Sequence, residues 1–300
     1  MSTSVSTSFV KQYERDVHDI FQLQGSVLKP GVRSVGNVVG SSTTFQKVGK
    51  GVATTKSRHG TITPMNQDHT AIECTISDFY AGDWVDKLDE AKITIDERGA
   101  IARGGAMALG RKVDDQILTV LAASAEDSGV VTITSYAAIR NGITEMIQRL
   151  ISNDAYEPGH LYGVLSPVFW SMLMTVDQFQ NADFVGADGM EFKKNAPAKG
   201  RFKDWLGVMW TVHSAVPGIA TSTADIFCWN KRSVGYATGK HSGNIASASG
   251  AETAIAADIT WHGDRAAHFI NHAMSGGACA IDATGMITSQ VDDTGALPTS

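Results

Sequence analysis

The 300-residue chain is poor in the features that mark several classes of protein. Its three cysteines, Cys74, Cys228 and Cys279, are odd in number and far apart in the sequence, which argues against a disulfide framework or a cysteine-based zinc site. No run of 18 apolar residues predicts a membrane span, and the N-terminus lacks the basic start and apolar block of a signal peptide. Charged residues make up 19%, below the roughly 25% of an average soluble domain, so more of the surface is expected to contact protein.

What is present is ample for a folded core, because 43% of the residues are hydrophobic. Strands and helices are expected to mix without strict alternation, which favours an α+β fold over a doubly wound sheet. Helices are predicted at residues 9–23, 97–125 and 135–152, and from Pro167, where Ser166 occupies the cap position. Strands are predicted at residues 130–134, 160–165, 205–217 and 224–230, and residues 238–257 are predicted to be a surface loop before two closing strands.

Charge is unevenly distributed along the chain, whose net charge is −6. Residues 20–67 contain no acid and six basic residues: Lys29, Arg33, Lys47, Lys50, Lys56 and Arg58. Residues 78–97 contain seven acidic residues: Asp78, Asp83, Asp86, Asp89, Glu90, Asp96 and Glu97. Opposite charges on adjoining segments suit self-association, although a solvated loop beside a solvated acidic face is the plainer alternative.

A long polar hairpin is predicted within the basic span. Residues 43–52 and 70–80 are rich in Thr, Val, Ile and Phe, and they flank the polar centre "TKSRHGTITPMNQDH". A hairpin this polar has too few apolar side chains to bury both faces in its own domain. We therefore expect it either to extend into solvent or to lie on another subunit.

The stretch "GGAMALGRKVDD", residues 104–115, resembles a phosphate-binding loop at first sight. However, the nearest strand-like segment ends ten residues before Gly105, and Lys112 stands where Ser or Thr should hold magnesium. Apolar residues at helical spacing instead predict a helix over residues 97–125. Its glycines, including Gly104 and Gly105, each cost about 1 kcal/mol relative to Ala, so they are expected to admit a closely packed neighbour, either the N-terminal arm or another subunit.

No other motif predicts catalysis or a cofactor. His262, His268 and His272 lie close together in "HGDRAAHFINH", but this segment favours a strand, in which residues four apart are separated by about 13 Å. Neither a nucleophile elbow, nor paired carboxylates, nor basic residues interleaved with stacking aromatics are found. We therefore expect no catalytic residue, no metal and no cofactor.

The order and lengths of these elements resemble the major capsid proteins of tailed bacteriophages, which have the Hong Kong 97-type fold. The resemblance covers nearly the whole chain, through the hairpin, the long helix ending "GRKVDDQIL", and the segments "YGVLSPVFWSMLM", "GVMWTVHSAVPG", "DIFCWNKRSVGYATG" and "GGACAIDATGMI". It implies an N-terminal arm (1–42), an extended hairpin loop (43–80), a peripheral domain with a spine helix (81–130, helix 97–125), a mainly axial domain (131–255), and return strands with a tail (256–300).

The resemblance also implies a function, which is self-assembly of hexamers and pentamers into an icosahedral head around double-stranded DNA, inside the bacterial host cytoplasm. Expected partners are further copies of the chain, the portal, separate scaffold or decoration proteins, and DNA held non-specifically. Some relatives carry a cleaved scaffold segment before the arm; here the arm begins almost at Met1, so we expect no such segment and expect any scaffold to be a separate protein. Some also form lysine–asparagine cross-links, but nothing in the sequence selects Lys47, Lys50 or Lys56 for one.

Residues on two opposed charged segments and in the helix are the candidates for subunit interfaces. They are Lys47, Lys50, Lys56, Arg58, Asp83, Asp86, Asp89, Glu90, Gly104 and Gly105. Two alternatives stay open: an encapsulin-like shell, which has the same fold but encloses a protein cargo, and a soluble metal-dependent enzyme that uses the histidines around His268.

Overall fold

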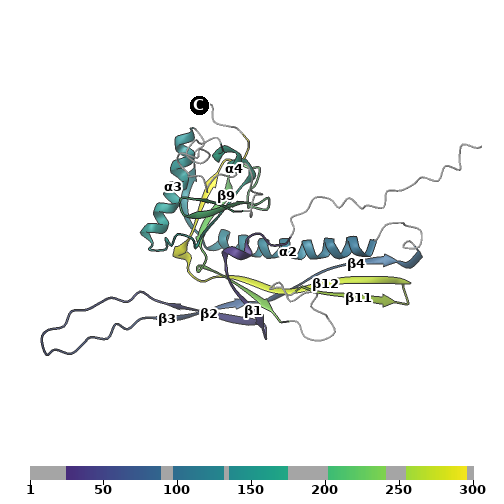
Figure 1. The fold of residues 1–300 in the computed structure, drawn as a ribbon, viewed down its shortest axis with the longest axis horizontal. Coiled ribbons are helices and arrows are strands. Elements are labelled where there is room, and N and C mark those ends of the chain that lie inside the picture. The colour runs from purple at the N-terminus through teal and green to yellow at the C-terminus, as the bar shows by residue number, and fades with distance from the viewer. Residues whose placement is uncertain (1–24, 89–96, 132–134, 175–201, 241–254, 296–300) are drawn as a thin grey trace, which may run out of the picture. The chain divides into compact units, whose positions relative to one another are not determined.

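The computed structural model describes residues 25–88, 97–131, 135–174, 202–240 and 255–295 (Figure 1). The chain divides into two compact units, one formed by residues 1–25, 78–111 and 241–274, the other by residues 26–77, 112–240 and 275–300. Helix α2 (Glu97–Ser124) and strand β12 (Ala267–Ala280) contribute residues to both units. Among the described residues, none of the helices combines the length and hydropathy that crossing a bilayer requires.

A six-stranded mixed sheet lies at the core of the second unit, in the order β5-β13-β9-β6-β8-β7. Its strands are β5 (Glu126–Val131), β6 (Leu161–Leu165), β7 (Lys203–Trp205), β8 (Val208–Val212), β9 (Ala224–Asn230) and β13 (Met286–Val291). Strand β13 is antiparallel to β9 and parallel to β5, while β6 is antiparallel to β9 and parallel to β8. All five residues of β6 are buried, as expected for a strand that is covered on both faces.

Two helices complete this core, and serine caps begin both of them. Helix α3 (Tyr136–Ser152) begins after Ser135, whose side chain accepts a hydrogen bond from the backbone N–H of Ala138. Helix α4 (Pro167–Leu173) begins after Ser166, which accepts from the N–H of Phe169. Each cap satisfies one of the N–H groups that a helix start leaves unpaired, which is why both helices begin where the sequence predicts.

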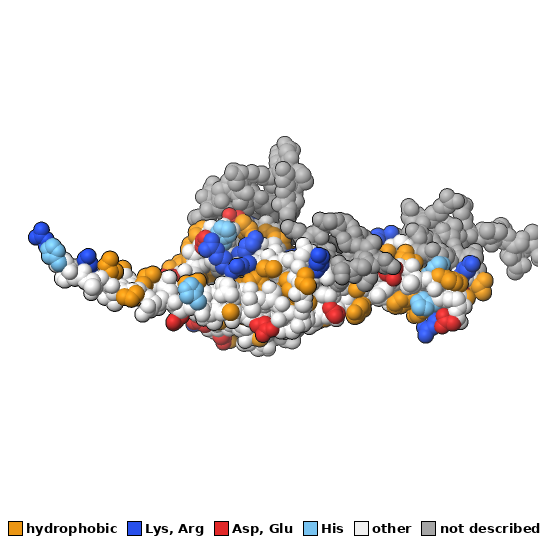
Figure 2. All heavy atoms as spheres, turned by 90° about the horizontal axis from the view of Figure 1, so that it is seen from below, with side chains coloured by type: hydrophobic (Ala, Val, Ile, Leu, Met, Phe, Trp, Pro, Cys, Tyr) orange, Lys and Arg blue, Asp and Glu red, His pale blue; other side chains and the backbone are white. Residues whose placement is uncertain are grey.

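The hairpin predicted from the polar segments is present in the second unit, formed by β2 (Ser42–Val48) and β3 (His69–Thr75). These strands are antiparallel, from the pair Ser42 and Thr75 to the pair Val48 and His69, and within the described chain they pair only with each other. Residues 49–68 contain no strand and are almost entirely exposed. In Figure 2 the far end of the hairpin carries basic and histidine side chains, with hydrophobic side chains along its length.

The hairpin packs against a second set of strands through Phe45 and Cys74, which share a buried cluster with Ala237 and Ile281. Strand β1 (Arg33–Val38), which follows the short 3₁₀ helix η1 (Lys29–Gly31), runs parallel to β10 (Val234–Gly239). Strand β10 is buried throughout and is antiparallel to residues 276–280 of β12. A second 3₁₀ helix, η2 (Ala283–Gly285), connects β12 to β13.

The first unit is built on the remaining part of β12. Residues 267–274 are antiparallel to β11 (Ile255–His262), and β4 (Ser77–Asp86) also pairs with β12. The N-terminal half of α2 belongs to the same unit.

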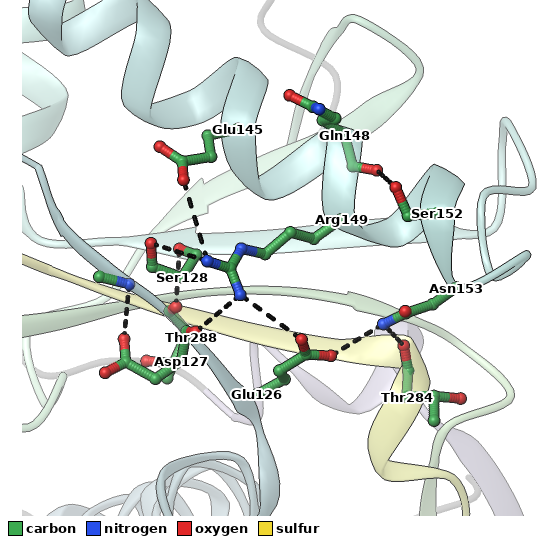
Figure 3. A network of polar contacts seen from close by, with 11 residues as sticks. Glu126, Asp127, Ser128, Glu145, Gln148, Arg149, Ser152, Asn153, Thr284 and Thr288 are labelled. Carbon is green, nitrogen blue, oxygen red and sulfur yellow. Dashed lines mark hydrogen bonds and ion pairs between the residues drawn. The ribbon is translucent and has the colours of Figure 1, made fainter.

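An arginine of α3 fixes the edge strand β5 to the helix (Figure 3). The guanidinium of Arg149 donates to the backbone carbonyls of Asp127 (3.0 Å) and Ser128 (3.4 Å), and lies 3.4 Å from the carboxylate of Glu126. The other carboxylate oxygen of Glu126 accepts from the side-chain amide of Asn153 at 2.9 Å. The contacts therefore run from the last turn of α3 to the start of β5.

Several sequence-based boundaries are wrong, because tertiary pairing divides segments that look continuous in sequence. Residues 70–80 form parts of two strands. The N–H of Ile76, between them, donates to the carbonyl of Ser41 (2.8 Å), and β4 then pairs with β12 instead of β2. Residues 205–217 divide at Leu206 and Gly207, whose positive φ angles form a two-residue turn between β7 and β8.

Near the C-terminus, three strands close the fold rather than two: β11, β12 and β13. The surface loop predicted at 238–257 is wrong at both ends, because β10 extends through Gly239 and β11 begins at Ile255; residues 241–254 lie outside the described residues. The strand predicted at 130–134 is β5, which begins earlier, at Glu126. The helix expected at 9–23 lies outside the described residues.

Candidate interaction surfaces

Two lysines of the hairpin are held by carboxylates of their own chain. The ammonium of Lys47 lies 2.9 Å from Asp282, and that of Lys50 lies 2.6 Å from Asp154. Lys50 lowers the pKa of the Asp154 carboxyl through a hydrogen bond and its charge. Partial burial acts to raise the pKa of Asp282, but hydrogen bonds from Lys47 and Thr284 outweigh it and hold that pKa below its ordinary value. These ion pairs link the outer end of the paired strands, and the first residues of the loop beyond it, to the rest of the second unit.

The two basic residues nearer the tip differ from this pair. Lys56 and Arg58 are exposed, and neither has an ion-pair partner within the part of the chain that the structure describes. Exposed apolar side chains lie in the same segment, among them Val52 (73% exposed) and Ile62 (76%). The tip thus presents both charge and apolar surface that no described residue of its own chain covers or pairs with.

The acidic candidates lie in the first unit or beyond the described residues. Asp83 and Asp86 are exposed in β4, and each uses one carboxylate oxygen locally, to accept from the N–H of Trp84 (2.8 Å) and Leu88 (2.7 Å) respectively. Asp89 and Glu90 lie outside the described residues.

The glycines of α2 have different surroundings, although they lie in one helix. A Cβ atom added at Gly105 would lie 2.5 Å from Nδ1 of His272, a buried histidine in β12, so this glycine admits a ring from its own chain. A Cβ atom at Gly110 would lie 2.6 Å from the backbone of Gly25. At Gly104 an added Cβ would meet nothing within 4 Å. A close neighbour is therefore present at Gly105 and Gly110, but only at Gly110 does it belong to the predicted arm segment, through Gly25; at Gly105 it is β12 of the same chain, and not the arm or another subunit as expected. Gly104 has no such neighbour among the described residues.

The three histidines of "HGDRAAHFINH" occupy β11 and β12 and do not converge. His262 packs edge-on against Trp84, with ring centroids 5.0 Å apart, and His268 lies 4.8 Å from Trp261. Nδ1 of His272 is buried without a hydrogen-bond partner in the described chain. The described residues contain no group of three or more His, Cys, Asp or Glu side chains placed to bind one metal ion.

Two cysteines that are distant in sequence are neighbours in the second unit. Cys74 donates to the carbonyl of Gly277 (3.3 Å) and also forms a side-chain hydrogen bond with Cys279. That bond lowers the pKa of the Cys74 thiol and raises the pKa of the Cys279 thiol. All three cysteines are free, and burial raises the pKa of Cys228.

A buried carboxylate that the sequence analysis did not identify organises the start of the second unit. Asp114 of α2 is fully buried and accepts from the backbone N–H groups of Val27 (2.9 Å) and Leu28 (3.0 Å). Nε2 of His213 lies 3.1 Å from the same carboxylate, while Nδ1 of His213 accepts from the N–H of Ala215, so the Nε2 hydrogen points at Asp114. An acidic residue on the apolar face of a predicted helix is the signal that could have revealed this network.

A basic concavity was also missed, because its residues come from three separate segments. We call it the basic pocket; it encloses about 460 Å³ and is lined by Val32, Arg33, Ser34, His160, Lys231 and Arg232. Lys and Arg side chains gather on the face that Figure 2 shows. The only carboxylate found beside these basic groups among the described residues is Glu157, which lies 3.3 Å from Arg232 and 3.9 Å from His160.

Comparisons with known proteins give consistent results. A family model described as phage capsid protein matches residues 5–293. A search of curated proteins found no match. Solved structures with a similar fold include one from Mycobacterium phage Che8 (12% identity, TM-score 0.69), which aligns over 97% of this chain and 99% of its own.

Two further structures are similar over comparable lengths. The capsid of cyanophage P-SCSP1u is 15% identical, with a TM-score of 0.71, over 98% of this chain and 96% of its own. The capsid of Ralstonia phage GP4 is 10% identical, with a TM-score of 0.68, over 97% of this chain and 98% of its own. At such low identity these likenesses establish the fold, which is consistent with the Hong Kong 97 type.

Proposed function

Because the chain belongs to the phage capsid protein family, it is a structural component of a phage head, and we propose that it assembles as hexamers and pentamers into an icosahedral shell. We infer that shell formation takes place in the host cytoplasm and that the shell encloses double-stranded DNA. Portal, scaffold and decoration proteins are the further partners we propose. We also infer that the chain is not an enzyme, since the family is structural.

The observation that carries this proposal is the incomplete burial of the hairpin β2–β3. A two-stranded hairpin is marginally stable alone, and its tip exposes Val52, Ile62 and Met65. Docking on a neighbouring copy would cover these side chains without requiring any change in the pairing of β2 with β3. Closed symmetry would then repeat the contact around the shell, so that many weak interfaces add up.

The intrachain ion pairs indicate which basic residues are available for the proposed interface. Lys47 and Lys50 already have intrachain carboxylates, so of the four basic candidates we assign the contact between copies to Lys56 and Arg58. Their counterparts in the neighbouring copy are the acidic candidates Asp83, Asp86, Asp89 and Glu90. Electrostatic complementarity of this kind sets register and speeds encounter more than it adds affinity. Gly104, which has no close neighbour among the described residues, is proposed to admit a backbone of another copy.

We retain, as part of this proposal, the division into an N-terminal arm (1–42), an extended hairpin loop (43–80), a peripheral domain (81–130), a mainly axial domain (131–255), and return strands of the peripheral domain with a C-terminal tail (256–300). It is supported by the similarity of the fold to capsid structures over nearly the whole chain. In this scheme α2 is the spine helix of the peripheral domain.

Electron microscopy of the purified chain tests the proposal. We expect hollow polyhedra, rings or hexameric plates; a stable monomer at every salt concentration would contradict it. Nucleic acid inside particles from phage-producing cells is expected for a genome shell, whereas a protein cargo would favour an encapsulin-like shell. Small oligomers with bound zinc would favour the enzyme alternative.

A pair of charge-reversal variants tests the proposed contact. K56E/R58E and K47E/K50E each reverse two charges on the hairpin. We expect K56E/R58E to prevent particle formation while the chain stays folded by circular dichroism. K47E/K50E should chiefly break the ion pairs with Asp282 and Asp154, each of which contributes at most about 1 kcal/mol to the stability of the folded chain. If the two variants assembled equally well, the charges of Lys56 and Arg58 would have no role in the contact between copies.

A further inference from the structure

The basic pocket gathers positive charge from three segments that are far apart in sequence. Arg33 lies at the start of β1, His160 directly before β6, and Lys231 and Arg232 in the turn between β9 and β10. In the sequence these residues form no basic run.

Backbone hydrogen bonds and strand pairing tie together the segments that carry the pocket, so the backbone positions of its basic residues are fixed before any ligand arrives. The N–H of Lys231 donates to the carbonyl of His160 (2.8 Å), and the N–H of Arg232 donates to the side chain of Asn230 (2.9 Å). Strand β1 is fixed by its pairing with β10, and the Arg33 guanidinium lies 5.5 Å from the centroid of the Phe45 ring. Such preorganisation lowers the entropic cost of binding.

Among the described residues, carboxylates neutralise only part of the charge of the pocket. Arg33 and Lys231 have no carboxylate within ion-pair distance among the described residues, and Glu157 is shared between Arg232 and His160. The arrangement is therefore a local positive concavity on a chain whose net charge is −6. A volume of about 460 Å³ gives room for a sugar-phosphate unit, and Arg presents a planar fork that matches phosphate geometry.

Four of the acidic side chains named above are poorly suited to fill this pocket from a second copy. Asp83 and Asp86 are three residues apart in β4, so they project from opposite faces of the strand. Asp154 and Asp282 are already paired with lysines. A nucleic acid backbone has no such constraint, because duplex DNA carries a phosphate about every 3.4 Å along each strand.

We propose that the basic pocket binds the phosphate backbone of duplex DNA, without reading its sequence. The inference rests on the proposed function, since packaged DNA is the nucleic acid that a head protein meets. It adds a defined contact site to a chain that otherwise repels DNA through its negative charge. Such a contact holds DNA loosely, because phosphate pairs weaken steeply with salt.

Two matched variants test this site. K231Q/R232Q and K56Q/R58Q each remove one lysine and one arginine charge from exposed or partly exposed positions, the first in the pocket and the second at the hairpin tip. Binding of short duplex DNA by the full chain, kept below the concentration at which it assembles, is measured by fluorescence anisotropy at several salt concentrations. Circular dichroism checks that both variants fold.

We expect K231Q/R232Q to reduce the slope of log affinity against log salt by about 2, since each phosphate contact contributes about 0.9. Duplexes of different sequence should lose affinity by the same factor. K56Q/R58Q should bind like the unmodified chain. Equal losses in both variants, no loss in either, or no DNA binding by the unmodified chain would overturn the proposal.

Assembly is scored separately by microscopy, so that a failure of this inference can be distinguished from a failure of the proposed function. K231Q/R232Q is expected to form particles like those of the unmodified chain. If it retained DNA binding but lost assembly, the pocket would serve a second copy and the proposal would be wrong. If the unmodified chain formed no particles, the proposed function would fail, while the DNA measurement would still decide the role of the pocket.

Discussion

The hairpin β2–β3 and the strands β6 and β10 belong to the same unit but bury their side chains to very different extents. Every residue of β6 and β10 is buried, whereas β2 and β3 have one buried residue each, Phe45 and Cys74. The pairing of β2 with β3 sets the register of the hairpin, and the ion pairs of Lys47 and Lys50 link it to the rest of the unit. Most of the hairpin surface nevertheless stays exposed. The comparison separates residues that hold the chain folded from residues that are available to another copy.

The largest expected effect is in the core. Trp210 is fully buried and its indole N–H donates to the carbonyl of Trp205 (3.2 Å). We expect Trp210→Ala to reduce the free energy of unfolding by about 3–5 kcal/mol through the cavity it leaves. Trp261→Ala is the control: that side chain is 47% exposed, so well under half of that loss is expected in urea unfolding. Similar losses for the two variants would contradict the assignment of the core.

The second largest effect on stability is expected at the buried carboxylate of Asp114. Asp114→Ala leaves the N–H groups of Val27 and Leu28 and the ring of His213 without their acceptor, and we expect a loss of about 2–3 kcal/mol. Its neighbour Asp115 is exposed and paired with Lys112 at the surface, so Asp115→Ala should cost at most about 0.5 kcal/mol. Chemical denaturation of both variants measures the difference; equal values would mean that the network does not hold the arm segment.

Two adjacent glycines of α2 offer a finer comparison. Gly105→Ala would bring a methyl group against the buried ring of His272, and we expect a loss of about 1–3 kcal/mol. Gly104→Ala meets open space and should stabilise the helix by about 1 kcal/mol. Thermal unfolding of the free chain measures whether each substitution raises or lowers the stability. If Gly104→Ala also destabilised the free chain, an unseen intrachain neighbour would have to lie there; if it impaired assembly alone, Gly104 would lie at an interface.

What the sequence predicts correctly is set by neighbouring residues. The caps Ser135 and Ser166 act within three residues of themselves, and the periodicity of α2 is local, so these helix starts and the long helix follow from the sequence. The polarity of residues 49–68 similarly predicts an exposed hairpin tip.

What the sequence does not predict depends on contacts between distant residues. Arg33, His160 and Lys231 become neighbours only through the pairing of β1 with β10 and the turn after β9. Asp114 looks like one more charge in "GRKVDDQIL" until it meets Val27, 87 positions away. The sequence presents the four basic candidates as one group, whereas the structure pairs Lys47 and Lys50 with carboxylates and gives Lys56 and Arg58 no ion-pair partner among the described residues.

The smallest expected effect on the free chain comes from shortening the hairpin. Replacing residues 51–66 by Asn-Gly keeps the strand pairs and the ion pairs of Lys47 and Lys50, and supplies a turn that suits two antiparallel strands. We expect the free energy of unfolding to change by less than about 0.5 kcal/mol, because the removed residues bury almost nothing. Urea denaturation of the shortened and full-length chains measures the change.

The central claim, that the hairpin tip serves neighbouring copies and not its own fold, is tested most directly by microscopy of the same shortened chain. At matched protein concentration and salt, the full-length chain is expected to form closed particles, and the shortened chain to remain folded but unassembled. Closed particles formed equally well by the shortened chain would contradict the claim, since the uncovered tip would then contribute nothing to the shell.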